Sequence, residues 1–382
     1  MTGYKKSDLG VIPVEWDAKA LGDVGDCLIG LTYRPSDVRK SGTLVLRSSN
    51  VQNGTLCFGD NVFVEADIPE RIMVRPGDIL VCVRNGSRDL IGKSALIDER
   101  AIGMTFGAFM GVFRSDHGDY LHHVFQSGIF KKQINEHLGA TINQITNKSL
   151  NSFKVPLPKN SEERTKIASV LSDADSLLNS LDSLIAKKRN LKQAAMQQLL
   201  TGQTRLPGFG GEWEVKRLGD VLKICHGRSQ REVETVDGPY PILATGGQIG
   251  RSSRPLCDRP SVLIGRKGTI NKPQYMDSPF WTVDTLFYSE MKGSNCAQYF
   301  FYLFCTIDWM QFNEASGVPS LNARTIENIE VHCPESIEQI AIAAALSDID
   351  FELSALEVRR DKTRSVKQGM MQELLTGRTR LV

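Results

Sequence analysis

The sequence predicts an α+β protein in which two strand-rich domains are separated by two long helices that pair as an antiparallel coiled coil. Three observations predict this fold class. The chain has 382 residues, enough for two or three domains. Two forty-residue stretches, 167–206 and 342–381, share 21 identities without a gap, which makes the chain a pseudo-twofold internal repeat. The repeated stretches have the apolar spacing of helices, whereas the remaining blocks are rich in short β-branched and aromatic runs.

The composition excludes several classes of protein. With 41% hydrophobic and 24% charged residues, the chain is typical of a folded soluble protein. It has no apolar run of roughly 18 to 20 residues and no apolar segment of a signal peptide near its start, so we expect a cytoplasmic location and no membrane partner. The eight cysteines form no C-x-x-C pair and the six histidines no H-x-x-x-H pair. We therefore expect reduced, mostly buried thiols and no metal site.

The repeat also has a second matching segment. EWDAKALGDV around Trp16 returns 197 residues later as EWEVKRLGDV around Trp213, whereas the forty-residue stretch returns after 175 residues. The blocks between the matching ends diverge and differ by 22 residues, which is 197 minus 175. This order suggests a fixed scaffold that carries two different variable domains. The predicted divisions are 1–157 and 207–333 for the variable domains, and 158–206 and 334–382 for the helical regions.

The first variable domain contains the predicted strands GTLVLRSSNV and PGDILVCV, followed by a helix in 120–138. Arginine, amide and lysine side chains gather in its turns 46–54 and 84–93. Such side chains bind base edges and phosphates, although polar turns with arginine are usually only turns. The candidate DNA-binding residues here are Arg47, Asn50, Gln52, Arg84, Asn85, Arg88 and Lys93.

The first long helix is predicted over 161–201, with no proline or glycine to interrupt it. Asn160 is the expected N-cap with Glu163 in the capping box, and Gly202 is the expected C-terminal stop. Acidic residues gather early and basic residues late, as the helix dipole favours. The residues expected to face a partner helix are Ile167, Leu171, Leu178, Leu181, Ile185 and Leu199.

The second variable domain contains the predicted strands SVLIG and FWTVDTLFY and a helix in 297–313. Its segment 245–274 carries six basic residues against the single acid Asp258, and its glycines permit tight turns. The candidate DNA-binding residues here are Thr245, Gln248, Arg251, Arg266, Lys267 and Lys272.

The second long helix repeats the first, with Ser336 as the expected N-cap, Gln339 in the capping box and Gly377 as the stop. Each helix would be a rod of roughly 60 Å, too long to stand alone with an exposed apolar stripe. We expect the two stripes to pair antiparallel, because the halves are then related by a twofold axis. The alternative is that each helix packs only on its own domain. The residues expected to pair are Ile342, Leu346, Ile349, Leu353, Leu356 and Leu374.

The net charge does not indicate a nucleic-acid binder. It is +2 for the whole chain. Residues 1–157 hold 18 basic and 17 acidic side chains, and residues 203–333 hold 14 of each. If the chain binds DNA, its positive charge must be local, or a partner must supply part of it.

These motifs together resemble the specificity subunit of type I restriction-modification systems. The resemblance rests on the two variable domains, each opened by EWxxxxLGDV and each closed by a long helix ending in LLTGxTRL, and on LRSSNVQNG, RPGDILV and IGK in the first domain. It implies a non-catalytic subunit with two target recognition domains, each of which reads half of a bipartite double-stranded DNA target. It also implies that the helices fix the gap between the half-sites and dock two adenine-N6 methyltransferase subunits, which two restriction subunits can join.

The resemblance implies no cofactor in this chain. S-adenosylmethionine would belong to the methyltransferase partner, and ATP and Mg to the restriction partner. In agreement, the sequence contains neither the N-P-P-Y/F or D-P-P-Y/F tetrapeptide of amino-group methylation nor G-x-x-x-x-G-K-[ST]. Two other hypotheses are a coiled-coil scaffold that joins proteins without binding DNA, and a recognition module cut from a single-chain methyltransferase-nuclease.

Overall fold

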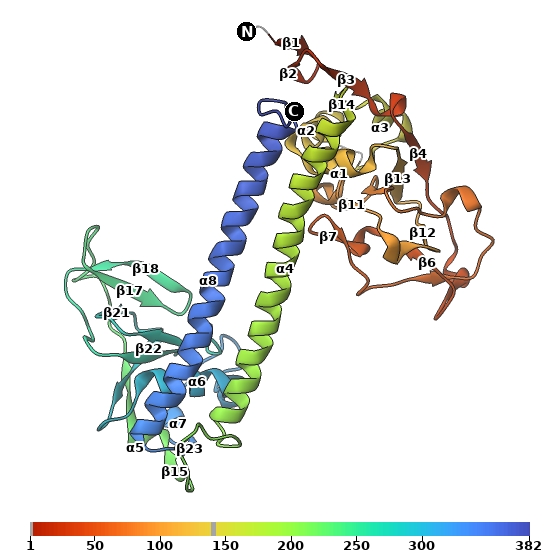
Figure 1. Ribbon diagram of the computed structural model, residues 1–382. Coiled ribbons are helices and arrows are strands. Elements are labelled where there is room, and N and C mark those ends of the chain that lie inside the picture. The colour runs from red at the N-terminus through yellow and green to blue at the C-terminus, as the bar shows by residue number, and fades with distance from the viewer. Residues whose placement is uncertain (1–2, 139–142) are drawn as a thin grey trace. The chain divides into compact units, whose positions relative to one another are not determined.

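The computed structural model describes residues 3–138 and 143–382 and divides the chain into two compact units. Unit 1 combines residues 1–180 with residues 360–382, and unit 2 comprises residues 181–359. Each unit thus contains one variable domain and one half of each long helix (Figure 1). None of the helices in these described ranges contains an apolar stretch that could span a membrane.

Unit 1 contains a four-stranded antiparallel sheet in the order β11-β10-β13-β4. A second four-stranded sheet, in the order β12-β6-β9-β5, has shorter strands and includes one parallel pair, in which Phe106 lies beside Leu46. The bounds are β4 Asp26–Ile29, β5 Val38–Arg39, β6 Thr43–Leu46, β9 Phe63–Val64, β10 Ile79–Cys82, β11 Ser94–Leu96, β12 Thr105–Phe106 and β13 Met110–Arg114. Shorter pairs join β1 Tyr4–Ser7 to β2 Gly10–Pro13, β3 Trp16–Ala20 to β14 Lys154–Pro158, and β7 Val51–Gln52 to β8 Thr55–Leu56.

The helix predicted over 120–138 is two helices, α1 Gly118–Gln126 and α2 Gly128–His137. Ser127 interrupts the helix because its backbone is extended, with ψ 164°, and its hydroxyl donates to the carbonyl of Val124 at 2.6 Å. Both helices contribute to a core that includes Trp16, Phe113 and Phe130, each fully buried. A third helix, α3 Asn147–Ser152, precedes β14.

Unit 2 has the same plan, with a four-stranded antiparallel sheet in the order β16-β22-β19-β20. Its second sheet, β18-β17-β21, again includes one parallel pair, in which Thr282 lies beside Leu243. The bounds are β15 Glu214–Arg217, β16 Leu222–His226, β17 Tyr240–Ala244, β18 Gly247–Ser252, β19 Ser261–Gly265, β20 Gln274–Met276, β21 Trp281–Thr282, β22 Leu286–Met291 and β23 Glu330–Cys333. The helices are α5 Leu218–Val221, α6 Ala297–Thr306, a 3-10 turn Trp309–Phe312, and α7 Ala323–Glu327.

The long helices are α4 Ser161–Leu199 and α8 Ser336–Leu374. Asn160 caps α4 as predicted, because its side-chain oxygen accepts from the amide of Glu162 at 2.8 Å. The predicted N-cap of α8 is wrong by one residue: Ser336 is already helical, and Gln339 instead accepts from the amide of Cys296 at 2.9 Å. Gly202 and Gly377 follow the two helices with φ of 71° and 70°, as expected of C-terminal stops.

The two helices run antiparallel in both units. In unit 1, the first half of α4 meets the last half of α8, where Lys367 pairs with Asp175 at 2.5 Å. In unit 2, the second half of α4 meets the first half of α8, where Lys192 pairs with Asp350 at 2.6 Å. The lysines are 175 residues apart, and so are the aspartates, so the same repeated pair forms twice with the two helices exchanged.

None of the residues predicted to lie between the helices is exposed. Near the helix ends they belong to the domain cores, so packing on the domains and pairing of the helices both occur. Ile167, Leu171 and Leu374 join the core of unit 1, and Leu199, Ile342 and Leu346 join the core of unit 2. Of the rest, Leu181, Ile185 and Leu353 are buried outside these cores, and Leu178, Ile349 and Leu356 are half-buried.

The repeated sequence motifs contact one another in a clamp at each helix start. In unit 1, the buried carboxylate of Glu163 accepts from the indole of Trp16 at 3.1 Å and pairs with Arg380 at 2.5 Å. In unit 2, Glu338 makes the same contacts with Trp213, at 3.1 Å, and with Arg205, at 2.5 Å. The tail that follows each helix therefore binds the start of the other helix, which explains why EW and TRL repeat together.

Candidate nucleic-acid interface

In unit 1, the two predicted DNA-binding turns lie side by side with two further loops. The amide of Asn85 donates to the hydroxyl of Ser48 at 3.4 Å, and Lys93 donates to the Ser48 carbonyl at 3.3 Å. The loop between β12 and β13 joins them through Phe109, whose carbonyl accepts from the backbone amide of Arg84 at 3.1 Å. The segment before α3 is the last member of the group: the backbone carbonyl of Asn143 accepts from the backbone amide of Asn85 at 3.4 Å.

Unit 2 brings together the corresponding loops. The backbone amide of Lys267 donates to the carbonyl of Thr285 at 3.2 Å, and that of Gly268 donates to the carbonyl of Pro319 at 2.8 Å. A Cβ on Gly268 would lie 3.8 Å from the hydroxyl of Thr245, so the turn after β17 is adjacent. The predicted residues Thr245 and Lys267 therefore share one surface.

The two loop groups correspond position by position. The shared parallel strand pairs and sheet registers align β6 with β17, β10 with β19, and β13 with β22. The same backbone hydrogen bonds then recur in both units. The Val83 amide donates to the Phe109 carbonyl, as the Arg266 amide donates to the Thr285 carbonyl. The Ile145 amide donates to the Val83 carbonyl, as the Leu321 amide donates to the Arg266 carbonyl. The equivalent pairs are Ser48 with Thr245, Arg84 with Lys267, Asn85 with Gly268, Phe109 with Thr285, and Asn143 with Pro319.

Several predicted residues are engaged inside their own domain. Asn50 is fully buried and donates to the carbonyls of Cys57 and Asp60, so its side chain holds the loop together. Arg47 pairs with Asp60 at 2.8 Å. Arg88 donates to the carbonyl of Leu138 at 2.9 Å, just beyond α2.

The remaining predicted residues lie nearer the surface. Arg84 is exposed, and its guanidinium lies 5.2 Å from the ring centroid of Phe109. Arg251 is exposed and donates to the carbonyls of Gly238 and Pro239, and Arg266 is half-buried and donates to the carbonyl of Asp284 at 3.3 Å. Gln52, Gln248, Lys267 and Lys272 are also exposed.

Sequence reasoning missed two kinds of residue in these loops. Ser48 and Asn143 are ordinary loop residues that only the fold brings beside Asn85. Phe109 is 60% exposed, but an aromatic residue inside the run GAFMG predicts a buried strand. No local signal distinguishes such a residue from a core residue.

A polar cluster in unit 1 contains side chains of the kinds that ligate metals. His122, His123 and Asp175 each offer an atom within 4.8 Å of the others. However, Lys367 already holds Asp175, and it also donates to the Gln126 side-chain oxygen at 3.1 Å. That bond turns the Gln126 amide nitrogen toward Nε2 of His122, at 3.0 Å, so Nε2 accepts and Nδ1 carries the proton. The ammonium group repels a divalent cation, and the Gln126 amide already occupies the Nε2 lone pair of His122.

The same cluster keeps both histidines neutral. Burial lowers the pKa of His122 from 6.5 to about 3, with smaller effects from His123 and Lys367. Burial and Lys367 lower the pKa of His123 to about 4. His123 also bonds Ser172 of α4 at 3.1 Å, so the cluster connects α1 to both long helices.

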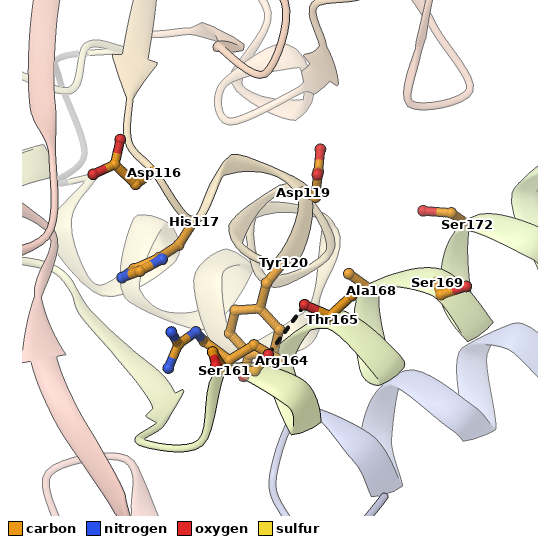
Figure 2. Close-up of a pocket in the computed structure, with 10 residues that line it drawn as sticks. All are labelled: Asp116, His117, Asp119, Tyr120, Ser161, Arg164, Thr165, Ala168, Ser169 and Ser172. Atoms are coloured by element: carbon orange, nitrogen blue, oxygen red, sulfur yellow. Dashed lines mark hydrogen bonds between the residues drawn. The ribbon is translucent and has the colours of Figure 1, made fainter.

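A pocket of about 430 Å³ lies beside this region, between the start of α1 and the first turns of α4 (Figure 2). Asp116 and His117 approach it from the segment before α1, and Tyr120 points toward the start of α4. The Tyr120 hydroxyl donates to the carbonyl of Pro156 at 2.9 Å, and Arg164 donates to the backbone carbonyl of Lys159 at 3.1 Å, so both are engaged within the domain. None of the predicted DNA-binding residues lines this pocket.

Comparisons with known proteins identify the family. The model of the type I restriction modification DNA specificity domain matches the chain twice, over residues 13–190 and 210–362. The chain therefore belongs to this family. It is a specificity subunit of a type I restriction-modification system, which is a non-catalytic class of subunit. The sequence-based fold class is confirmed by this repeat, by the solved structures below and by the paired α4 and α8.

The individual relatives share only about a quarter of the aligned residues with this chain. The StySPI specificity subunit of Salmonella potsdam is 25% identical over 240 residues, covering 58% of this chain and 52% of the relative. A putative specificity subunit of Methanocaldococcus jannaschii is 24% identical over 427 residues, covering 99% and 97%. The chain thus spans about half the length of the first relative and nearly all of the second. A crystal structure of a type I S subunit from M. genitalium has a TM-score of 0.67 at 17% identity, over 94% of this chain and 96% of that chain, which shows the shared fold.

Proposed function

We propose that this chain is the DNA-reading subunit of its restriction-modification enzyme and that each variable domain reads one half of a bipartite target. The observation that carries this proposal is the equivalence of the loop groups: Arg84 and Lys267 stand at the same backbone position of two otherwise divergent domains. A basic side chain at equivalent loop positions suits binding to DNA. A scaffold that joined only proteins would not need it.

The near-neutral charge of each domain predicts that the chain alone binds DNA weakly. Non-specific affinity depends on the number of phosphates that cationic side chains neutralise. We propose that two methyltransferase subunits supply much of this phosphate contact. These subunits would also bind the S-adenosylmethionine that methylation uses. Up to two restriction subunits would bring ATP and Mg. The long helices would hold the two readers at a fixed separation and so set the gap between half-sites.

The outer faces of the helices support a docking role. In unit 2, α4 exposes Leu184 and Leu191, and α8 exposes Phe351 and Val358; within each helix the two residues are seven positions apart. This heptad spacing is typical of a helix that packs against a further helix. Since α4 and α8 already contact each other through other residues, we propose these rows as the surface for the methyltransferase.

The test is to express the chain with its methyltransferase and to map methylated adenines across the cell's DNA. We expect a two-part target with a fixed gap, and loss of that pattern when the chain is omitted. A gel shift at stated salt, with and without the methyltransferase, separates this function from the protein scaffold. Absence of sequence-specific methylation by the folded complex would refute the proposal.

A further inference from the structure

Three positions at the loop end of the antiparallel four-stranded sheets are equivalent in the two units; two of them carry different chemistry, and the third is basic in both. Ile29 at the end of β4 lies opposite Gly111, and His226 at the end of β16 lies opposite Phe287. Because Gly111 and Phe287 occupy the same place in β13 and β22, Ile29 and His226 are equivalent. We define the reading edge of unit 1 as Ile29, Arg84 and Phe109, and that of unit 2 as His226, Lys267 and Thr285.

The reading edge of unit 1 exposes apolar side chains. Ile29 is 65% exposed and Phe109 is 60% exposed. Single exposed apolar residues are normal, so exposure alone indicates nothing. Here, however, the loop that presents Phe109 is fixed: its carbonyl accepts from the amides of both Val83 and Arg84 at 3.1 Å, and the Arg84 guanidinium lies 5.2 Å from its ring. The aromatic ring and the cation therefore form one prepared surface.

The reading edge of unit 2 presents polar and cationic groups at the same positions. His226 and Lys267 are exposed, and Thr285 is half-buried where unit 1 has Phe109. The imidazole of His226 lies edge-on to the buried Phe287, with ring centroids 4.9 Å apart, so its direction is set by the core. This edge offers hydrogen-bond donors and a hydroxyl, and no large apolar group.

We infer, on the basis of the proposed function, that the two reading edges recognise different base chemistry. The apolar edge of unit 1 contacts a thymine methyl group, so its half-site contains an A·T pair at that position. The edge of unit 2 donates from Lys267 to the O6 and N7 acceptors of guanine, with His226 as a second donor. The major groove distinguishes these bases in this way, because only thymine presents a methyl group and guanine presents two acceptors.

The test for unit 1 uses the assembled enzyme and a duplex that carries its mapped target. Replacing the thymines of the first half-site one at a time by uracil removes only the methyl group. At one position we expect the wild-type methylation rate at limiting DNA to fall about tenfold, the lower end of the effect of one lost apolar carbon. Phe109→Ala lowers the rate on the thymine target and abolishes its dependence on the methyl group. Val11→Ala, which removes an apolar side chain of similar exposure from the β1–β2 hairpin, keeps both the rate and the dependence.

The test for unit 2 replaces each guanine of the second half-site by 7-deazaguanine, which lacks the N7 acceptor. We expect a fall of about tenfold at one guanine for the wild type, and no further fall for Lys267→Ala. Lys223→Ala is the control, since this exposed lysine lies at the opposite end of β16. Circular dichroism and thermal melting verify that each variant is folded.

Failure of this inference differs from failure of the proposed function. If a bipartite target is mapped but neither uracil nor Phe109→Ala changes methylation of the first half-site, the apolar edge is not a reader. If 7-deazaguanine and Lys267→Ala act independently, Lys267 does not contact N7. If no sequence-specific target exists, the proposed function itself is wrong.

Discussion

In both units a repeated lysine and a repeated aspartate form an ion pair between α4 and α8, but the surroundings of this pair differ. In unit 1 the pair of Lys367 and Asp175 is almost enclosed, with the lysine side chain 10% exposed and two neutral histidines beside the carboxylate. In unit 2 the pair of Lys192 and Asp350 is more open, and Tyr302 donates its hydroxyl to Asp350 at 2.8 Å. The repeated helices therefore supply the same ion pair in both units, whereas the burial of that pair depends on the variable domain around it.

Breaking the clamp should have the largest effect on stability, and the effect should be equal in the two units. Glu163→Ala should destabilise unit 1 by about 3 kcal/mol, because it removes the partner of Arg380 and the acceptor of the Trp16 indole. Glu338→Ala should cost unit 2 a similar amount. Urea unfolding monitored by tryptophan fluorescence is suitable, since Trp16 is the single tryptophan of unit 1. Glu162→Ala, at an exposed neighbouring position, is the control; a large loss in only one unit would show that the clamps are not equivalent.

Acid should affect unit 1 more than unit 2. His122 and His123 have pKa values lowered to about 3 and about 4, below the 6.5 of an unfolded histidine, so the unfolded chain binds more protons between these values. The stability is complete above pH 6.5 and falls as the pH is lowered, by about 2 kcal/mol per histidine at pH 5. Asp175 and Lys367 are the charged groups that face this pair.

Hydrogen exchange at pH 7 and pH 5, measured separately for the peptides of each unit, checks this asymmetry. The double variant His122→Gln with His123→Gln removes the titrating groups and should lose most of the pH dependence of unit 1. Equal loss of protection in both units of the wild type would contradict the comparison.

Removing the lysines should sharpen the same contrast. Lys367→Met should cost about 2 kcal/mol, because Asp175 then lacks its cation in a poorly solvated place. Lys192→Met should cost about 1 kcal/mol, since that lysine side chain is 24% exposed and Asp350 keeps Tyr302. Lys367→Met should also raise the pKa of both histidines, because the ammonium charge lowers them. Thermal unfolding and NMR titration of the histidines measure these effects. Unchanged histidine pKa values would show that the Lys367 charge does not act on the two imidazoles.

The sequence predicted the parts of this fold that depend on local pattern or on repetition. Helical periodicity placed α4 and α8, and the repeated glycines placed their ends. The break at Ser127 and the first residue of α8 were missed because extended backbone and side-chain bonds to other segments decide them.

The candidate interface was only partly predictable. Composition selected Arg84 and Lys93 in unit 1 and Thr245 and Lys267 in unit 2. The fold brings the members of each pair into one loop group. Composition also selected Asn50, whose burial depends on the loop around it, and it missed Phe109, whose exposure depends on strands distant in sequence. Strand pairing is non-local, so no window of sequence shows which loops meet.

If one repeated frame carries two independent readers, a fragment of residues 1–205 should form a complete reader by pairing with a second copy of itself. This fragment keeps Lys192 and Arg205, which are equivalent to Lys367 and Arg380. A second copy can therefore supply the helix–helix ion pair and the clamp that unit 1 needs. Co-expressed with the methyltransferase, the fragment should dimerise and methylate an interrupted palindrome of the first half-site, because a twofold protein reads a twofold sequence. Methylation of the original asymmetric target by the dimer, or a fragment that stays monomeric, would show that the two halves of the frame are not interchangeable.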